Sequence, residues 1–419
     1  MKERGMQIKI ACERCGESNS VDSALYGRRV NCNSCRSSIL IPVSSSVSAD
    51  QSKFRSVFIA MASLSLTLGV LVALIWINPF GNSDSPNDKS SSSPSTQQTL
   101  RTPPANTRRF HEYADKNEQL FKLDDIPTPI FPDLERAKIL LPSKAKVYFI
   151  DLSREPENNP SVAGMSMKMR VYLPPGNHAP QSLACVLVTP AGTKLLHGNN
   201  VDEGEYHKET KPYVDAGMAV IFYSLDGPLS NQKHLNDLEI FKLLCVAYPK
   251  YKAAKAGVVN GRNALDFALS KLPEVDPEKI YCAGHSSAGT LSLLLAEHEP
   301  RIKACVAYAA STDIEGRLKD FINFPKLDEA LPGIKGFVKQ ASPKTHTSQL
   351  KCPVFLFHAK DDSNVPFANT LTFARRLEKQ NANVTFSESE TGDHYRSMIN
   401  DGIPRAIEWM QNLPDLSNN

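Results

Sequence analysis

One hexapeptide, Gly-His-Ser-Ser-Ala-Gly at residues 284–289, constrains this chain more than any other feature. The apolar run before it, residues 279–283, is typical of a strand, and the apolar run after it, residues 290–296, is typical of a helix. A serine on a tight strand-to-helix turn projects its hydroxyl above the sheet, with the helix N-terminus beneath it. The pattern therefore predicts such a turn at this point of the chain.

A steric demand selects which serine the turn exposes. The strand and the helix pass close together, so the residues two before and two after the serine have to be small. Gly284 and Ala288 meet that demand for Ser286, whereas a turn centred on Ser287 places His285 where a small residue is needed. Ser286 is therefore the candidate nucleophile, and capping of the following helix is its structural alternative. For His285, packing and contact with a substrate both stay open.

Two later loops offer an acid and a base. The apolar run 353–357 ends in a polar loop with Asp361 and Asp362, and the alternating run 384–387 leads to His394. Open α/β sheets place their sites at the C-terminal ends of strands, and one class of catalytic triad has the chain order Ser, Asp, His. One of the two aspartates is expected to form the turn itself.

These segments resemble the α/β-hydrolase fold, and within it the prolyl oligopeptidase-like and esterase branch, over residues 145–412 or so. That branch has a His-Gly-x-x-Asp-x-x-Val-Pro pattern at its acid loop, which is matched here by His358, Ala359, Asp362, Val365 and Pro366. The register implies that Asp362 is the acid. The branch's Gly-x-His turn matches residues 392–394 and implies that His394 is the base. His358, at a strand end, is expected to be a structural hydrogen-bonding group.

The chemistry of such a triad assigns a role to each group. His394 takes the proton of Ser286 as the serine attacks a carbonyl, and Asp362 holds the imidazole in the required tautomer. The developing oxyanion needs two fixed donors, and the N–H of Ser287 is the first candidate. The second is expected in the loop after the strand-like run 184–188, from Gly192 or from its neighbour Ala191.

The fold class follows from alternating strand and helix patterns. Continuous apolar runs at residues 184–188 and 219–223 are typical of parallel strands covered on both faces. Between residues 258 and 272, apolar residues follow helical spacing, with Leu269 among them. We therefore predict an α/β-hydrolase domain with a doubly wound, mostly parallel sheet at residues 109–415. Residues 313–350 are the natural place for a lid, with ordinary surface helices as the alternative.

The N-terminal part carries a separate signal. Cys12, Cys15, Cys32 and Cys35 form two Cys-x-x-Cys pairs, a spacing typical of a structural zinc site with four thiolates. Residues 1–45 resemble a bacterial zinc ribbon of the kind found before a membrane anchor. Such a small module depends on the metal for its stability. Unligated or disulfide-linked cysteine pairs are the alternative.

A membrane segment is predicted next. Residues 57–77 contain no charged side chain and are long enough to cross a bilayer. Lys53 and Arg55 precede this segment, so we expect a single-pass protein with a cytoplasmic N-terminus and an extracytoplasmic hydrolase domain. Residues 78–108 are rich in Ser and Pro and predict a linker. A cleaved signal peptide and a buried helix are the less favoured alternatives.

Charge and cysteine content exclude some functions. The 48 Lys and Arg residues exceed the 45 Asp and Glu residues by only three, so no nucleic-acid partner is expected. The five cysteines beyond residue 35 favour buried thiols over a disulfide framework.

The predicted protein is a membrane-anchored serine hydrolase of the carboxylesterase or acetyl esterase type. It needs no cofactor for catalysis, and a cytoplasmic protein is a possible partner of its ribbon. A peptidase of the prolyl oligopeptidase-like group, or a catalytically silent sensor or scaffold, are the alternatives.

Overall fold

The structure is a computed structural model of the 419-residue chain. It describes residues 7–11, 18–22, 29–31, 33–35 and 38–40, and residues 120–414 except 136, 141–142, 202–206, 230–234 and 381–382. The chain divides into two compact units, Met1–Ser63 and Leu64–Asn419. The predicted membrane helix at 57–77 and linker at 78–108 lie outside the described residues. Within the described residues, no helix combines the length and the apolar character needed to cross a bilayer.

The first unit contains two antiparallel hairpins. Strand β1 (Gln7–Ala11) pairs with β2 (Ser18–Asp22), and β3 (Arg29–Asn31) pairs with β4 (Ser38–Leu40). Each predicted Cys-x-x-Cys pair therefore falls in the connection between the two strands of one hairpin. Of the four cysteines, only Cys35 lies in the described residues. The zinc site stays a prediction.

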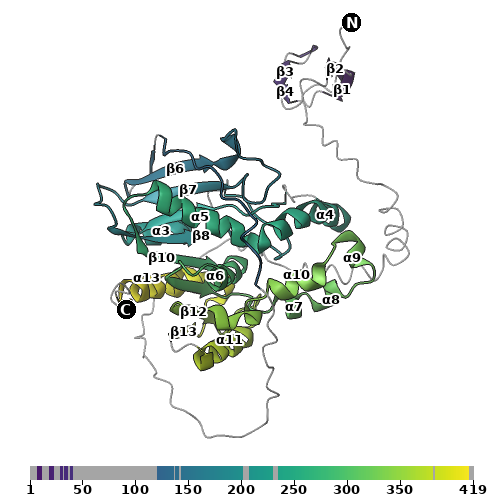
Figure 1. Cartoon of the computed structure of the whole chain (residues 1–419). Coiled ribbons are helices and arrows are strands. Elements are labelled where there is room, and N and C mark those ends of the chain that lie inside the picture. The colour runs from purple at the N-terminus through teal and green to yellow at the C-terminus, as the bar shows by residue number, and fades with distance from the viewer. Residues whose placement is uncertain are drawn as a thin grey trace, which may run out of the picture. The chain divides into compact units, whose positions relative to one another are not determined.

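The second unit is built on one mixed sheet (Figure 1). In the described residues it has nine strands, in the order β13-β12-β11-β10-β8-β9-β7-β6-β5. Strands β8 to β13 run parallel, and β5, β6 and β7 join antiparallel at one edge. The bounds are Lys138–Leu140 (β5), Ala145–Asp151 (β6), Lys168–Leu173 (β7), Leu183–Val188 (β8), Ala219–Tyr223 (β9), Val275–His285 (β10), Ala304–Tyr308 (β11), Val354–Ala359 (β12) and Val384–Ser389 (β13). The prediction of a mostly parallel sheet is confirmed.

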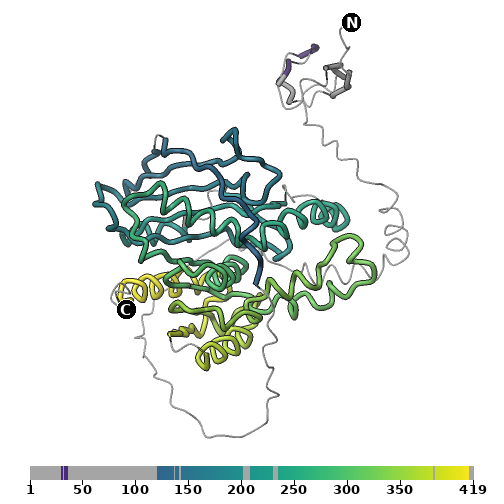
Figure 2. Tube along the Cα trace, in the orientation of Figure 1, coloured from purple at the N-terminus to yellow at the C-terminus, as the bar shows by residue number. Residues whose placement is uncertain are grey.

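Helices cover both faces of the sheet, as the trace in Figure 2 also shows. The helices are α3 (His207–Asp215), α4 (Asp237–Ala253), α5 (Val258–Lys271), α6 (Ser287–His298), α11 (Phe367–Gln380), α12 (Asp393–Ser397) and α13 (Ile403–Gln411). Helices α4, α5, α6 and α11 bury apolar side chains in one core, and α3 and α13 do so in a second core.

Strand β9 shows why the sheet has two cores. Its residues Ala219, Ile221 and Tyr223 lie in the first core, and Val220 and Phe222 lie in the second. Successive side chains of a strand point to opposite faces, so a continuous apolar run is what a doubly covered strand requires.

The helix predicted between residues 258 and 272 forms as α5, and the apolar residues with helical spacing are not all buried in it. Leu265 is fully buried, whereas Leu269 is 37% exposed. The segment considered as a lid forms four short helices: α7 (Ile314–Arg317), α8 (Lys319–Ile322), α9 (Leu327–Ala330) and α10 (Ile334–Gln340). Their apolar side chains belong to the first core, where Phe337 packs against Tyr248 and Tyr251 of α4.

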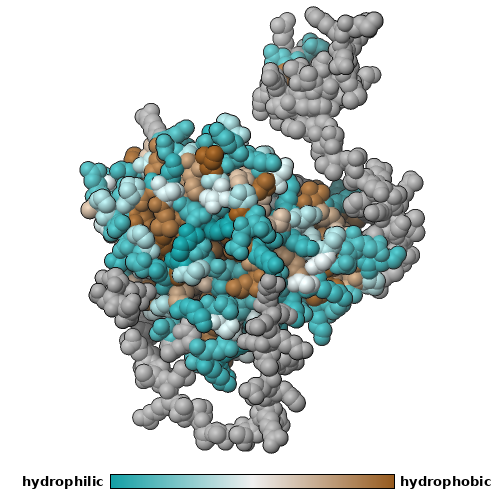
Figure 3. All heavy atoms as spheres, in the orientation of Figure 1, coloured by the Kyte–Doolittle hydropathy of each residue, from teal (hydrophilic) through white to brown (hydrophobic). Residues whose placement is uncertain are grey.

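Exposed apolar residues are dispersed over this unit. On the face drawn in Figure 3, they form separate patches within a mostly polar surface. The most exposed large apolar side chains are Val246, Ile139 and Phe149, at 65%, 56% and 54%. Such scattered exposure is normal for globular domains. Of the five cysteines predicted to be buried thiols, Cys185, Cys282 and Cys305 are buried, whereas Cys245 and Cys352 are only partly buried.

Candidate active site

The turn between β10 and α6 holds Ser286 in a strained conformation. Its φ of 55° and ψ of −121° are uncommon for a residue with a side chain. The Ser286 N–H donates to the Tyr308 carbonyl at 2.8 Å, and the Ser286 carbonyl accepts from the Thr290 N–H at 3.0 Å. Bonds to the neighbouring strand and to the helix thus fix the backbone of Ser286.

Close packing explains the small residues around Ser286. A Cβ added to Gly284 would lie 2.4 Å from the backbone carbon and oxygen of Ala288, closer than real Cβ contacts allow. A Cβ added to Gly289 would lie 2.8 Å from the Gly284 carbonyl oxygen. The predicted approach of strand and helix is therefore present, and glycine at 284 is a steric requirement.

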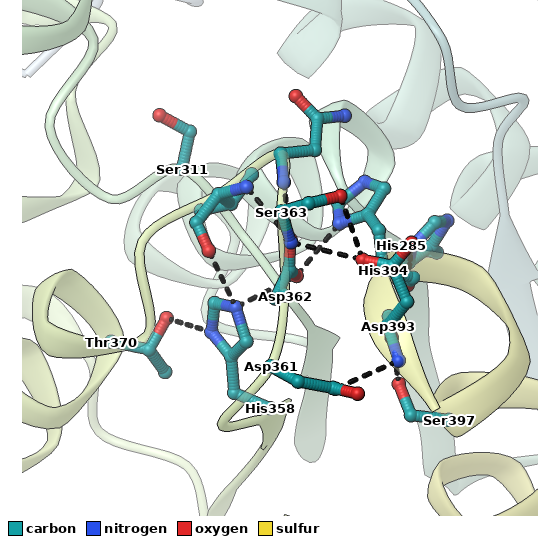
Figure 4. Close-up of polar contacts among 12 residues, drawn as sticks. His285, Ser311, His358, Asp361, Asp362, Ser363, Thr370, Asp393, His394 and Ser397 are labelled. Carbon is teal, nitrogen blue, oxygen red and sulfur yellow. Dashed lines mark hydrogen bonds and ion pairs between the residues drawn. The ribbon is translucent and has the colours of Figure 1, made fainter. Parts of the chain in front are cut away.

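Asp362 lies in the loop after β12 and accepts four hydrogen bonds (Figure 4). Its Oδ2 accepts from His394 Nδ1 at 2.8 Å and from His358 Nε2 at 2.9 Å. Its Oδ1 accepts from the N–H groups of Asn364 and Val365, both at 2.8 Å. The Asp362 side chain is fully buried, and that of His394 is 15% exposed.

These bonds determine the ionisation of Asp362. Burial by itself raises the pKa of the carboxyl, but the hydrogen bonds from His358 and His394 outweigh it. The pKa of Asp362 therefore lies well below its usual range, and the group is a carboxylate at neutral pH.

His358 is the second histidine that binds the Asp362 carboxylate. Its Nε2 lies 2.9 Å from Asp362 Oδ2 and 3.0 Å from the Val365 carbonyl oxygen, which are both acceptors. Nε2 therefore carries the hydrogen, and Nδ1 accepts from the Thr370 hydroxyl at 2.7 Å. With both nitrogens bonded and the side chain fully buried, His358 is placed as the structural group that the sequence predicted.

Hydrogen bonds in both directions join the loop that carries His394 to the loop after β12, which carries Asp362. Asp361 accepts from the N–H groups of Gly392 and Asp393 at 3.1 and 2.8 Å. In return, Asp393 accepts from the N–H and the hydroxyl of Ser363 at 2.9 and 2.8 Å. Sequence reasoning missed this exchange, although the polar run around Asp361 and the Gly-Asp turn before His394 are the signals that could have indicated it.

His285 links the loop that carries His394 to the turn that carries Ser286. Its Nε2–H donates to the His394 carbonyl oxygen at 2.8 Å, and the two imidazole rings lie 4.5 Å apart. Burial, and then the neighbouring His394, lower the pKa of His285 to about 3, so it is neutral. His394 thus lies against the residue that directly precedes Ser286.

The proposed triad is only partly joined by hydrogen bonds. In the described residues, Asp362 and His394 are bonded, but no hydrogen bond links the Ser286 hydroxyl to His394. Catalytic hydrogen bonds are often long without substrate and tighten when it binds. The catalytic roles of the three residues stay a prediction.

The loop after β8, which is expected to supply the second oxyanion donor, contacts the first residue of α6. Ser287 is the first residue of α6, and N–H groups of the first helical turn have no partner within the helix. The Thr193 N–H donates to the Ser287 hydroxyl at 3.1 Å, which brings the loop to this point. Gly192 has a positive φ of 83°, and a Cβ added to it would meet no atom within 4 Å. The Asn199 side chain donates to the Ala191 carbonyl at 2.9 Å and so fixes the backbone just before Gly192.

A small cavity lies behind the turn. Its volume of about 10 Å³ suits about one water molecule. Glu209 and the hydrogen-bonded pair Tyr213 and Tyr308 contribute to its wall. Burial raises the pKa of Glu209 to about 7. In the described residues, no group of His, Cys, Asp and Glu side chains is arranged to hold a metal ion.

Similarity to known proteins agrees with this architecture. The model of the prolyl oligopeptidase family matches residues 255–413. The acylamino-acid-releasing enzyme of Rattus norvegicus is 25% identical over 150 residues, which are 32% of this chain and 20% of that enzyme. The match thus spans about one fifth of that relative's length.

Solved structures show partial likeness. An acetyl xylan esterase from Paenibacillus sp. R4 is 16% identical, with a TM-score of 0.46 over 66% of this chain and 88% of that one. An esterase from Thermogutta terrifontis is also 16% identical, with a TM-score of 0.42 over 64% of this chain and 95% of that one.

The family match and the order of the strands support one conclusion about the fold. The parallel strands, the strained serine turn and the loops after β12 and β13 are arranged as the resemblance implied. The described part of residues 120–414 has a mostly parallel mixed sheet with helices on both faces, which fits an α/β-hydrolase fold, and residues 255–413 of it are similar to the prolyl oligopeptidase family.

The depressed pKa of Asp362 predicts a pH-dependent stability. The carboxylate stabilises the fold fully above its unfolded pKa of about 3.9, and this contribution is lost as the pH falls towards the lower folded value. Asp362→Asn should therefore lower the free energy of unfolding by about 1–3 kcal/mol at neutral pH. In urea denaturation, the gap to the wild type should shrink between about pH 5 and pH 3.

Val365→Ala is the matched control. It removes buried apolar contacts from the same loop without removing a carboxyl group. Its destabilisation should be the same at both ends of this pH range. A gap for Asp362→Asn that is equally constant would contradict the assigned role of the carboxylate.

Proposed function

We propose that the domain is a serine hydrolase that cleaves an ester through an acyl-enzyme. The observation that carries the proposal is the buried Asp362–His394 pair, held beside the strained turn of Ser286. His285, bonded to the His394 backbone, makes that connection. The prolyl oligopeptidase family match over residues 255–413 supports the same class of reaction.

In the proposed mechanism, His394 Nε2 accepts the Ser286 proton while Oγ attacks the ester carbonyl. Asp362 accepts from Nδ1–H and so keeps Nε2 free of a proton before the attack. The carboxylate then stabilises the imidazolium. His394 returns the proton to the leaving alcohol, and a water molecule repeats the sequence on the acyl-enzyme.

The oxyanion of each tetrahedral intermediate needs N–H donors. Ser287 and Gly192 are the proposed donors, because the Thr193–Ser287 bond holds their two backbones together. Their N–H groups do not have to reorganise during the reaction, which is the main advantage of fixed donors.

An ester is the preferred substrate class, because an alcohol leaves more readily than an amine. The second candidate is a peptidase, which the matched family and the limited identity to an acylamino-acid-releasing enzyme favour. A panel of para-nitrophenyl esters, acetylated sugars and short peptides separates the two. A catalytically silent sensor or scaffold would hydrolyse none of them.

Covalent labelling tests the assignment of the nucleophile. A fluorophosphonate probe should label the wild-type protein covalently, and Ser286→Ala should abolish both labelling and ester hydrolysis. Ser270→Ala is the matched control, because it removes the hydroxyl of an exposed serine on α5 and should keep both labelling and hydrolysis. Labelling that persists in Ser286→Ala, or that never occurs in the wild type, would refute the assignment.

The proposal includes a structural zinc ion in the N-terminal unit. The four proposed ligands are Cys12, Cys15, Cys32 and Cys35, and the hairpin pairing of β1–β2 and of β3–β4 is compatible with two metal-binding turns. The metal would supply stability rather than chemistry. A cytoplasmic protein is the proposed partner of this ribbon.

Elemental analysis of the full chain tests the zinc site. The purified protein should contain about one zinc ion per chain. Cys12→Ser with Cys32→Ser should lose it, whereas Cys245→Ser, in the hydrolase domain, should retain it. Zinc far below one equivalent in the wild type would count against the site.

We also propose that residues 57–77 anchor the protein in a membrane, with the N-terminus in the cytoplasm and the hydrolase domain outside. The uncharged segment and the preceding Lys53 and Arg55 support this orientation. Protease added to intact spheroplasts should digest the hydrolase domain of the membrane-bound protein. A domain that is digested only after lysis would overturn the orientation.

A further inference from the structure

The small cavity behind the turn lies against the residues that hold Ser286. Its wall includes Gly284 and His285 from the end of β10, Tyr308 from the end of β11, and Glu209 from α3. Tyr308 is also the residue whose carbonyl accepts from the Ser286 N–H. The cavity volume of about 10 Å³ suits one water molecule, which needs several polar partners to be stable in a buried site.

Glu209 is a buried acid without a protein partner. It is 6% exposed, and within the described residues its carboxyl group makes no hydrogen bond and no ion pair. A buried polar group without a partner costs free energy, so native proteins contain few of them. Because Glu209 contributes to the cavity wall, a water molecule at this point can supply the missing hydrogen bond.

His285 presents a second polar atom without a partner. Ala283, two residues earlier in β10, belongs to the second core, and side chains two apart in a strand share a face. The His285 Nε2–H donates to the His394 carbonyl oxygen at 2.8 Å (Figure 4), so Nδ1 of this neutral ring is an acceptor. In the part of the chain that the structure describes, no group donates to this Nδ1. His285 also contributes to the cavity wall.

The tyrosine pair at the cavity adds a donor. The hydroxyl oxygens of Tyr213 and Tyr308 lie 2.6 Å apart, so one hydroxyl donates to the other and one hydroxyl hydrogen is left over. Among the described residues, no acceptor binds that hydrogen. A carboxyl group, an imidazole acceptor and a phenolic donor thus belong to the wall of a space that suits one water molecule.

We propose that the cavity binds one water molecule that joins Glu209 to His285 Nδ1, and that Glu209 is thereby a positioning residue for His394. The water fixes the orientation of the His285 ring, and the Nε2–H of this ring holds the His394 backbone. This inference rests on the proposed hydrolase function, in which His394 acts on Ser286. Because Glu209 is buried behind the turn, it affects the chemical step and not the binding of the substrate.

Ester hydrolysis by the full chain tests this role. Glu209→Leu is of similar size but cannot bond to water, so kcat for para-nitrophenyl acetate should fall by about tenfold, as expected for one lost hydrogen bond. KM should stay nearly unchanged, because no contact with the substrate is removed. Glu209→Gln keeps hydrogen-bonding groups at the same position and should retain most of the wild-type kcat.

Glu297→Leu is the matched control. Glu297, on α6, is also buried, and its two carboxyl oxygens have no hydrogen-bond partner, but it does not contribute to the cavity wall. This variant should hydrolyse the ester at the wild-type rate, which excludes a general effect of replacing a buried acid. A kcat of Glu209→Leu that equals the wild-type value would overturn the inference.

A double-variant cycle tests whether Glu209 acts through His285. His285→Phe keeps an aromatic ring but removes both nitrogens, so it should also lower kcat. If the water joins the two residues, Glu209→Leu should cause no further loss in the His285→Phe background. Losses that multiply in the double variant contradict the bridge, as does a kcat of Glu209→Gln as low as that of Glu209→Leu.

A crystal structure of the full chain separates failure of this inference from failure of the proposed function. A water molecule within hydrogen-bond distance of both the Glu209 carboxyl and His285 Nδ1 is expected, whether or not the protein hydrolyses esters. A cavity without water, or with a water that contacts only one of the two groups, overturns the inference even if esters are hydrolysed. A wild-type protein that hydrolyses no ester and is not labelled at Ser286 means instead that the proposed function has failed.

Discussion

The close approach of β10 and α6 at Gly284 is the constraint on which the site depends. Because a Cβ at this position would lie 2.4 Å from the Ala288 backbone, strand and helix can meet here only with glycine at 284. Strand β10 ends at His285 and α6 begins at Ser287, so Ser286 alone connects them and takes the strained conformation. The strain is sustained by bonds to Tyr308 and Thr290 and by a core that is packed on both faces of the sheet.

A hydrogen-bond network joins the loops after β12 and β13. Their side chains exchange hydrogen bonds in both directions, through Asp361 and Asp393, and the Asp362 carboxylate has four donors. A buried carboxylate is costly unless its oxygens are satisfied. The network therefore does two things at once, because the bonds that keep Asp362 ionised also orient His394 and hold the two loops together.

Local patterns were sufficient for the strands and for the turn at Ser286. The reason is that apolar periodicity and the need for small residues are properties of neighbouring positions in the chain. The choice of Asp362 and His394 came from the resemblance of the acid loop and the Gly-x-His turn to a known family, and the structure joins the two residues by a hydrogen bond, while their catalytic roles stay a prediction. The bonds of Asp361 and Asp393 and the contact of His285 with the His394 backbone were decided only by the tertiary structure. They join segments that are distant in sequence, and their geometry depends on how the parallel strands align and on how each loop leaves its strand. The exposure of Leu269 has the same origin, since helical spacing predicts a face but the packing of α5 determines where the buried face ends.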